Sequence, residues 1–515
     1  MARYKEPLID QFQIVTLNFA DLFPPEHPIP QLLATIRKLN LEKFDAGYDN
    51  DSAAGGRPAF PPDRMLALII YSLLYGNLSM RHLERDLAQR ADLMYLSGGL
   101  QIDHSTLGKF RIRHAAAIKE VFTQTVFLGV EAGLIDLEVV CIDSTKIKAS
   151  ANRRDIGTKE ELEKRFALVG ESCNKRYIQW ESETNEDLKK GLAKKIDKLE
   201  KAKIKLAHGI EFLKSHADRK RVHLTDPDAD WHKESGNFIV GYSAQTAVDT
   251  NSGMVVHADV VTGQADSNYA VSLVNAVEAV KNEVLPDKTD EIKHVLDCGY
   301  ASEANLKDLS GRDLYLPDRD FSSENIGGKL KPEDRAEVRA QKLKAMETGL
   351  KFQYDAQSNS FKCPEKKTLN FKREKQLQGV LYSQFVAGGC RQCSLHALCA
   401  GTNNSRKQLW VQSAQLAGMQ AKLVAPQGAK SFKKPNTNPL TLAMREKLTT
   451  PDGKTIYAKR FAAIEGTFGI IKNARQGWHF LRRKLERVQV EWSERLIAHN
   501  LAKLIGFRQI DLQRA

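Results

Sequence analysis

The sequence predicts a mixed α/β core that is interrupted twice by insertions and flanked by helices on both sides. Three features support this prediction: an alternation of strand and helix patterns between about residues 136 and 320, a lysine-rich heptad segment inside it, and a cysteine-containing segment after it. The chain has 515 residues. This is too long for one ordinary core, so we expect about three domains, or one core with large insertions.

Residues 1–135 are expected to form an N-terminal helical domain. Apolar residues recur at helical spacing in MLALIIYSLLYG, RHLERDLAQRADLMYLSGG and TLGKFRIRHAAAIKEVFTQTVFLGVEAGL. Asp103 and Ser105 stand just before the third helix and can cap its N-terminus. These helices could form a DNA-binding module or a plain structural bundle. The basic residues Lys109, Arg111 and Arg113 make the two interpretations about equally good.

Residues 136–320 carry the strands of the predicted sheet. LEVVCIDST reads as a buried strand that ends in Asp143, and NFIVGYSAQTAVD and MVVHADVV read as a β-hairpin joined by the turn at 250–253. The helix SNYAVSLVNAVEAVKNEV follows. EIKHVLDCGYAS then gives a strand that ends at Asp297, and DLYLPDRD gives a last short strand. This order predicts a mixed sheet with helices packed on it.

Two insertions divide this core. At about 155–225, leucines recur every seven residues among many lysines, which predicts a solvated helical hairpin with a structural role. Residues 321–450 are charged and irregular and form an inserted subdomain. Four of its cysteines have spacings that suit a tetrahedral, ribbon-like structural Zn²⁺ site, with free thiols as the alternative: Cys363, Cys390, Cys393 and Cys399. Helices in residues 451–515 are expected to complete the core.

The charge and hydropathy of the chain indicate which binding partners and which cellular location to expect. Lys and Arg number 77 against 64 Asp and Glu, a net charge of +13, so nucleic acid is the leading partner. No stretch approaches the roughly 20 apolar residues of a membrane span, and the start lacks the apolar run of a signal peptide. We therefore expect a cytoplasmic, nucleoid-associated protein without membrane contact. Seven scattered cysteines argue against a secreted disulfide framework.

Three carboxylates suggest metal-dependent phosphodiester chemistry. Two divalent cations held roughly 3.5 to 4 Å apart need about three anionic side chains that converge on one point. Asp143 and Asp297 end predicted strands, and Glu465 lies on a helix that could cross the edge of the sheet. Rival carboxylates occur near the hairpin and read as turn residues, the first being the best substitute: Asp249, Asp259 and Asp266.

Motifs along most of the chain carry a family resemblance. They are GRPAFPPDRML, DHSTLGKFR, VVCIDSTKIKASA, GYSAQTAVD, HVLDCGYAS and YAKRFAAIEGTFGIIK. The chain resembles bacterial insertion-sequence transposases of the DDE type, in the set with a Tyr-Arg-Glu-Lys signature. The resemblance implies a ribonuclease H-like core in which Asp143, Asp297 and Glu465 bind Mg²⁺ or Mn²⁺. It also implies binding to terminal inverted repeats of double-stranded DNA, strand cleavage and strand transfer.

The signature maps onto the glutamate helix as Tyr457, Arg460, Glu465 and Lys472, for which the resemblance implies contacts to DNA phosphates. The Arg460 to Glu465 spacing is one residue longer than the family pattern.

Because transposition holds two DNA ends together, we expect a homodimer on DNA. Two alternatives remain open: a nuclease of the same fold without strand transfer, and a domesticated DNA-binding protein without catalysis. Trp478 could stack on an unpaired base or pack in the protein.

Overall fold

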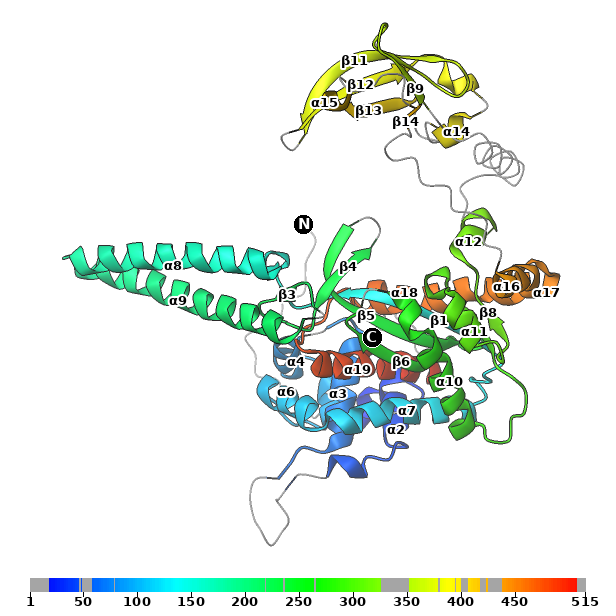
Figure 1. Cartoon of the computed structure of the whole chain (residues 1–515). Coiled ribbons are helices and arrows are strands. Elements are labelled where there is room, and N and C mark those ends of the chain that lie inside the picture. Colours follow the sequence, from blue (N-terminus) through cyan, green and yellow to red (C-terminus); the bar gives the residue numbers. More distant parts are fainter. Residues whose placement is uncertain are drawn as a thin grey trace, which may run out of the picture. The chain divides into compact units, whose positions relative to one another are not determined.

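The computed structural model describes residues 18–45, 48, 58–77, 79–217, 219–234, 237–263, 265–325, 352–377, 380–393, 395–399, 406–416, 423–424 and 438–506. The chain divides into two compact units, Met1–Pro317 with Met444–Ala515, and Asp318–Ala443. Figure 1 shows the elements of each unit. No helix in the described ranges is long and apolar enough to cross a membrane.

The N-terminal part of the first unit is helical, as predicted. Its helices are α1 (Phe19–Leu22), α2 (Pro28–Ile36), α3 (Pro62–Leu74), α4 (Met80–Leu87), α5 (Ala91–Ser97), α6 (His104–Arg113) and α7 (Ala115–Glu131). The capping prediction for Asp103 is confirmed, since its carboxylate accepts the backbone N–H groups of Ser105 at 2.9 Å and Thr106 at 2.8 Å. The C-terminal helix α19 (Leu485–Leu504) packs on α3 and α7 and shares their apolar core.

A mixed sheet follows, as the strand patterns predict. Its strands are β1 (Val139–Lys148), β4 (Asp230–Glu234), β5 (Asn237–Asp249), β6 (Val255–Val261), β7 (Lys293–Leu296) and β8 (Leu314–Tyr315). The order is β4-β5-β1-β7-β8, with β6 paired to the same edge of β5 as β4. β5 runs antiparallel to β1, β4 and β6, whereas β1, β7 and β8 are parallel. The predicted β5–β6 hairpin is present; β4 was not predicted.

Alternation along β1 separates an apolar face from the face that carries Asp143. Val140 and Ile142 lie in a core shared with α7 and with α10 (Ala270–Val284). Asp143 points to the opposite face, because successive strand residues alternate. On that side β1 contacts α17 (Pro451–Arg460) and the helical turn after it.

Two long antiparallel helices, α8 (Lys159–Ser182) and α9 (Glu186–Ser215), project from the sheet region (Figure 1). Thr158 and Glu161 form a capping box that starts α8. At the base of the hairpin, β2 (Ile156–Gly157) pairs with β3 (Val222–His223), and Leu162, Leu206 and Val222 share a small apolar cluster.

The second unit contains an antiparallel sheet where the sequence suggested irregular structure. Its strands are β9 (Phe352–Asp355), β10 (Ser360–Lys362), β11 (Thr368–Leu377), β12 (Val380–Ala387), β13 (Gln408–Gln412) and β14 (Leu423–Val424), in the order β13-β12-β11-β10-β9-β14. Short helices α12 (Arg319–Asn325), α14 (His396–Cys399) and α15 (Ser413–Leu416) accompany it. The strands escaped prediction because their core is small and aromatic, and much of β11 is charged and exposed.

The helical run after α16 (Pro439–Thr449) is continuous but not uniform. After α17 come a π-helical turn at Phe461–Glu465, a short α18 (Gly466–Gly469) and a second π-helical turn at Ile470–Ala474. The signature residues therefore lie on a helix with two changes of hydrogen-bond pattern.

Candidate active site

Strand register places Asp143 and Asp297 at the same level of the sheet. The parallel pairing of β1 with β7 ends at Ile142 opposite Leu296, so each aspartate is the first residue after the last paired one. Neighbouring strands lie about 4.8 Å apart, which brings the two carboxylates close together. Asp297 follows its strand, as predicted. The prediction that Asp143 ends its strand was wrong, because β1 continues to Lys148 as the partner of β5.

Arg460 joins the two aspartates. Its Nη2 atom lies 2.5 Å from Asp143 Oδ2 and 3.4 Å from Asp297 Oδ1. Burial raises the pKa of Asp143 to about 6; Arg460 opposes this shift and the negative charge of Asp297 adds to it. Burial also opposes the charge on Arg460, but the two aspartates outweigh it and raise the pKa of the guanidinium. The site is thus a partly buried pair of like charges with one cation between them.

Glu465 lies at the end of the first π-helical turn, and its side chain is exposed. A π turn closes with i→i+5 hydrogen bonds and holds one more residue than an α turn. The extra residue between Arg460 and Glu465 is therefore taken up locally, and Glu465 follows Arg460 by about one turn. In the described parts of the chain, no three His, Cys, Asp or Glu side chains are grouped closely enough to hold a metal ion. The structure brings together Asp143, Asp297 and Arg460, while Glu465 is near them on the helix without completing the cluster.

The other two signature residues are buried. Tyr457 is 7% exposed, and burial raises the pKa of its hydroxyl. Lys472 is also 7% exposed, and its Nζ atom lies 5.2 Å from the centroid of the Trp478 ring. Trp478 itself is 45% exposed, so its outer face is open to solvent.

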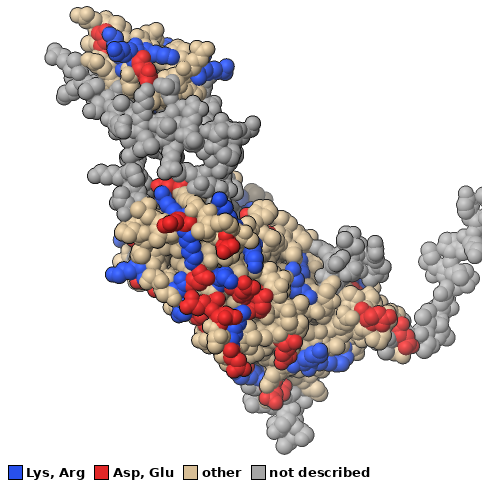
Figure 2. Space-filling model, turned by 90° about the vertical axis from the view of Figure 1, so that its right-hand side faces the viewer, with Lys and Arg blue, Asp and Glu red and all other residues tan. Residues whose placement is uncertain are grey.

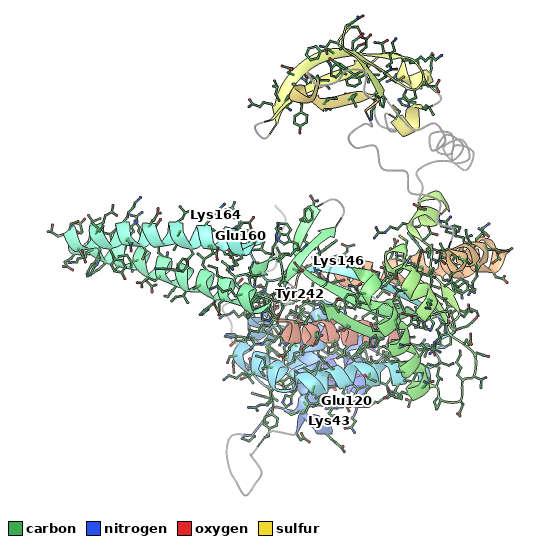
Figure 3. The ribbon with its side chains drawn as sticks, in the orientation of Figure 1. Lys43, Glu120, Lys146, Glu160, Lys164 and Tyr242 are labelled. Atoms are coloured by element: carbon green, nitrogen blue, oxygen red, sulfur yellow. The ribbon has the colours of Figure 1, made fainter. Side chains whose placement is uncertain are left out.

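A second polar cluster lies on the other face of β1 and was missed by the sequence analysis. Lys146, which is labelled in Figure 3, donates from Nζ to Ser243 Oγ at 2.6 Å and to Asp266 Oδ1 at 2.9 Å. Gln245 Nε2 donates to the same Asp266 oxygen at 3.0 Å, and Gln245 Oε1 accepts a hydrogen bond from the Tyr300 hydroxyl. Burial opposes ionisation of Asp266, but Lys146 and Gln245 outweigh it and lower its pKa. The sequence pattern that could have predicted this cluster is the occurrence of polar residues at alternate positions of β1 and β5.

The remaining rival carboxylates have structural roles. Asp249 is fully buried, and its Oδ2 accepts the backbone N–H groups of Asn251 and Ser252, both at 3.1 Å, in the β5–β6 turn. Asp259 accepts the backbone N–H of Val260 and the side chain of Gln489. These carboxylates belong to turns and helix contacts.

The four predicted zinc ligands line one pocket of the second unit: Cys363, Cys390, Cys393 and Cys399. Burial raises the pKa of the Cys399 thiol to about 11, with Lys407 opposing and the other three thiols adding to the shift. The backbone N–H of Lys367 donates to Cys363 Sγ at 3.3 Å. The thiols are neighbours, although they do not form a closed ligand set.

Fold and site together define a mixed α/β protein with an acidic site where two parallel strands stop pairing, opposite an arginine-bearing helix. Family models match the chain as a transposase domain (DUF772) over residues 17–113 and as a transposase DDE domain over residues 362–505. These two matches support an insertion-sequence transposase of the DDE type. The second match contains Arg460 and Glu465, whereas Asp143 and Asp297 lie outside both matched ranges. Comparison with curated proteins and with solved structures gives no match.

Proposed function

We propose that the chain cuts the ends of an insertion sequence and joins them to target DNA, using a ribonuclease H-like core. The observation that carries this proposal is the register that sets Asp143 beside Asp297 at the end of the β1–β7 pairing. The strand order supports it: three antiparallel strands lead into two parallel ones, and the first aspartate lies on the central strand.

The proposed metal ligands are Asp143, Asp297 and Glu465. The donor chemistry fits Mg²⁺ or Mn²⁺, because carboxylate oxygens are the ligands that hard cations prefer. Two such ions, when bound, would activate the attacking water or 3′-hydroxyl and stabilise the leaving oxygen. Asp143 and Asp297 hold the negative charge at one point, and Arg460 balances it. Arg460 and Lys472 are also the proposed contacts to DNA phosphates, together with Tyr457.

The proposed organisation assigns DNA binding to the helical domain 1–135 and catalysis to 136–320 with 451–515. Within the helical domain, Lys109 and Arg113 remain candidate contacts to DNA. Arg111 does not, because it is 5% exposed and pairs with Glu494. We further propose a homodimer that holds both terminal inverted repeats, and a structural Zn²⁺ in the segment 321–450 held by the four neighbouring thiols.

The direct test is Mg²⁺-dependent cleavage and joining of a labelled duplex that carries the element's terminal repeat. Intact protein is compared with Asp143→Ala, Asp297→Ala and Glu465→Ala, and the Asp249→Ala variant tests the rival carboxylate. We expect nicked and joined products from intact protein and none from the first three variants, each of which still binds DNA. Cleavage without joining would support a nuclease instead, and binding without chemistry would support a domesticated protein.

A further inference from the structure

Two adjoining cavities at the base of the α8–α9 hairpin are lined by an excess of cations. The smaller has a volume of about 210 Å³ and the larger about 620 Å³, and Arg165 lines both. Six cations line the two cavities: Arg154, Arg165, Arg221, Lys198, Lys201 and Lys205. The carboxylates that line them are Asp155 and Glu161.

Local contacts leave this positive charge largely unbalanced. Arg165 donates to the backbone oxygens of Arg154 at 2.9 Å and Ile156 at 3.4 Å, so uncharged groups fix its guanidinium. Glu161 accepts the Thr158 backbone N–H at 2.9 Å as part of the capping box. Lys201 pairs with Asp197 at 2.7 Å. Across the described ranges, no ion pair engages the arginines of the smaller cavity.

The smaller cavity has the chemistry of a phosphate site. Guanidinium groups present planar donor pairs that match phosphate oxygens, and three of them converge here. Trp231 forms one wall, with the Arg221 guanidinium 5.8 Å from its ring centroid. The larger cavity continues the positive surface along α9 through its lysines. A polymer with regularly spaced phosphates suits both cavities better than a single free anion does.

The cavity also lies within reach of DNA that covers the two aspartates. Trp231 is on β4 next to Asp230, and Gly241 pairs with both Asp230 and Lys148, the last residue of β1. Asp143 precedes Lys148 by five residues, roughly 16 Å along a strand, or about five phosphates of one DNA strand. On the side of α16 and α17, by contrast, Asp and Glu side chains gather in the middle of the face (Figure 2).

We propose that the cavity lined by Arg154, Arg165 and Arg221 binds backbone phosphates of the DNA that the chain processes. This inference rests on the proposed function only in taking DNA as the substrate. The hairpin base then becomes a second DNA contact, separate from the signature helix, and the α8–α9 insertion has a binding role in addition to its structural one.

The test uses full-length protein and the double variant Arg154→Ala/Arg221→Ala, since both arginines are exposed and neither side chain fixes the backbone. The matched control is Lys175→Ala/Arg176→Ala, which removes the same charge from α8 outside both cavities. Dissociation constants are measured over a range of salt concentrations for a terminal-repeat duplex and for an unrelated duplex. We expect about tenfold weaker binding to both duplexes and a salt slope smaller by about 1.8 for two lost phosphate contacts.

Arg154→Lys/Arg221→Lys should keep most of the wild-type slope, because the charges remain. The inference would be overturned if the alanine variant kept the wild-type DNA affinity and salt slope. It would also be overturned if the control variant lost as much affinity, or if the alanine variant lost affinity for the terminal-repeat duplex alone. Failure of the proposed function would give a different result. Intact protein that binds DNA through this cavity but neither cuts nor joins it would refute catalysis and would still support the phosphate site.

Discussion

Arg460 is the residue on which the charge balance of the site depends. Its guanidinium lies between two carboxylates that would otherwise repel one another, and it is itself mostly buried. A divalent cation bound by the same carboxylates, as we propose, would compete with it for their oxygens. Arg460 is therefore a positioning residue for the aspartates when no metal is bound.

Replacing Arg460 by Gln should lower the free energy of unfolding of metal-free protein by about 2 kcal/mol, because a partly buried charge pair loses its partner. Mn²⁺ should restore much of that stability and should bind several-fold more tightly than to the wild type. Thermal unfolding with and without Mn²⁺, together with calorimetric titration, measures both effects. Lys459→Gln on the same helix is the control, and equal metal affinity in wild type and Arg460→Gln would refute the competition.

The raised pKa of Asp143 predicts a pH dependence with a definite sign. Its ordinary pKa is near 3.8 and burial raises it to about 6, so the folded protein holds the proton more tightly than the unfolded chain. This contribution to stability is complete below about pH 3.8 and is lost as the pH rises through 6. We expect the unfolding temperature of metal-free wild type, relative to Asp143→Asn, to fall between pH 4 and pH 7. A constant difference across that range would contradict the burial of this carboxylate.

At the scale of elements, the π-helical turn at Phe461–Glu465 accommodates the extra residue between Arg460 and Glu465 of the signature. The sequence shows the longer spacing between Arg460 and Glu465 but not where the helix absorbs it. Apolar periodicity assigns a helix here and cannot distinguish i→i+4 from i→i+5 hydrogen bonding. By the same logic, β5 and β6 were predictable from alternation and a turn motif, whereas β4 is short and polar and β11 carries several charges.

Deleting Ala462, an exposed residue of this π turn, should convert it to an α turn and leave the rest of the helix in register. We expect the unfolding temperature and DNA cleavage to stay close to wild type. Deleting Ala458 from the α-helical part is the matched control, and it should abolish cleavage because it rotates Arg460 away from the aspartates. Equal damage from the two deletions would show that the π turn does not absorb the extra residue.

The cysteine cluster predicts that the second unit binds zinc and is stabilised by it. Cys390→Ser/Cys393→Ser should remove bound zinc and lower the unfolding temperature of this unit, since a structural Zn²⁺ contributes directly to folding. Metal content by mass spectrometry and unfolding with a chelator measure the two effects. Cys173→Ser in α8 is the control and should change neither. A wild-type protein purified without zinc, and unaffected by added zinc, would leave the thiols as free cysteines.

At the scale of the whole chain, folding depends on pairs that are remote in the sequence. Arg111 of α6 lies against Glu494 of α19, 383 residues away, with Nε 2.7 Å from Oε1 and a second bond from Nη2 to Oε2. Helical periodicity locates both helices, but it cannot tell which buried charges meet. For the same reason the sequence alone makes Arg111 a candidate DNA contact, and Arg460 a phosphate contact only.

Breaking the Arg111–Glu494 pair should cost more than breaking any exposed pair. The two side chains are 6% and 0% exposed, so Glu494→Gln leaves a guanidinium buried without its counter-charge. We expect a loss of about 3 to 5 kcal/mol in the free energy of unfolding of the first unit, measured by denaturant titration. Arg111→Met/Glu494→Leu, which removes both charges, should lose much less. Asp63→Asn, which breaks the more exposed pair with Arg37, should lose about 1 kcal/mol or less. If Glu494→Gln cost no more than Asp63→Asn, the pair would not connect the N-terminal helices to α19, and the apolar contacts of α19 with α3 and α7 would have to hold them together alone.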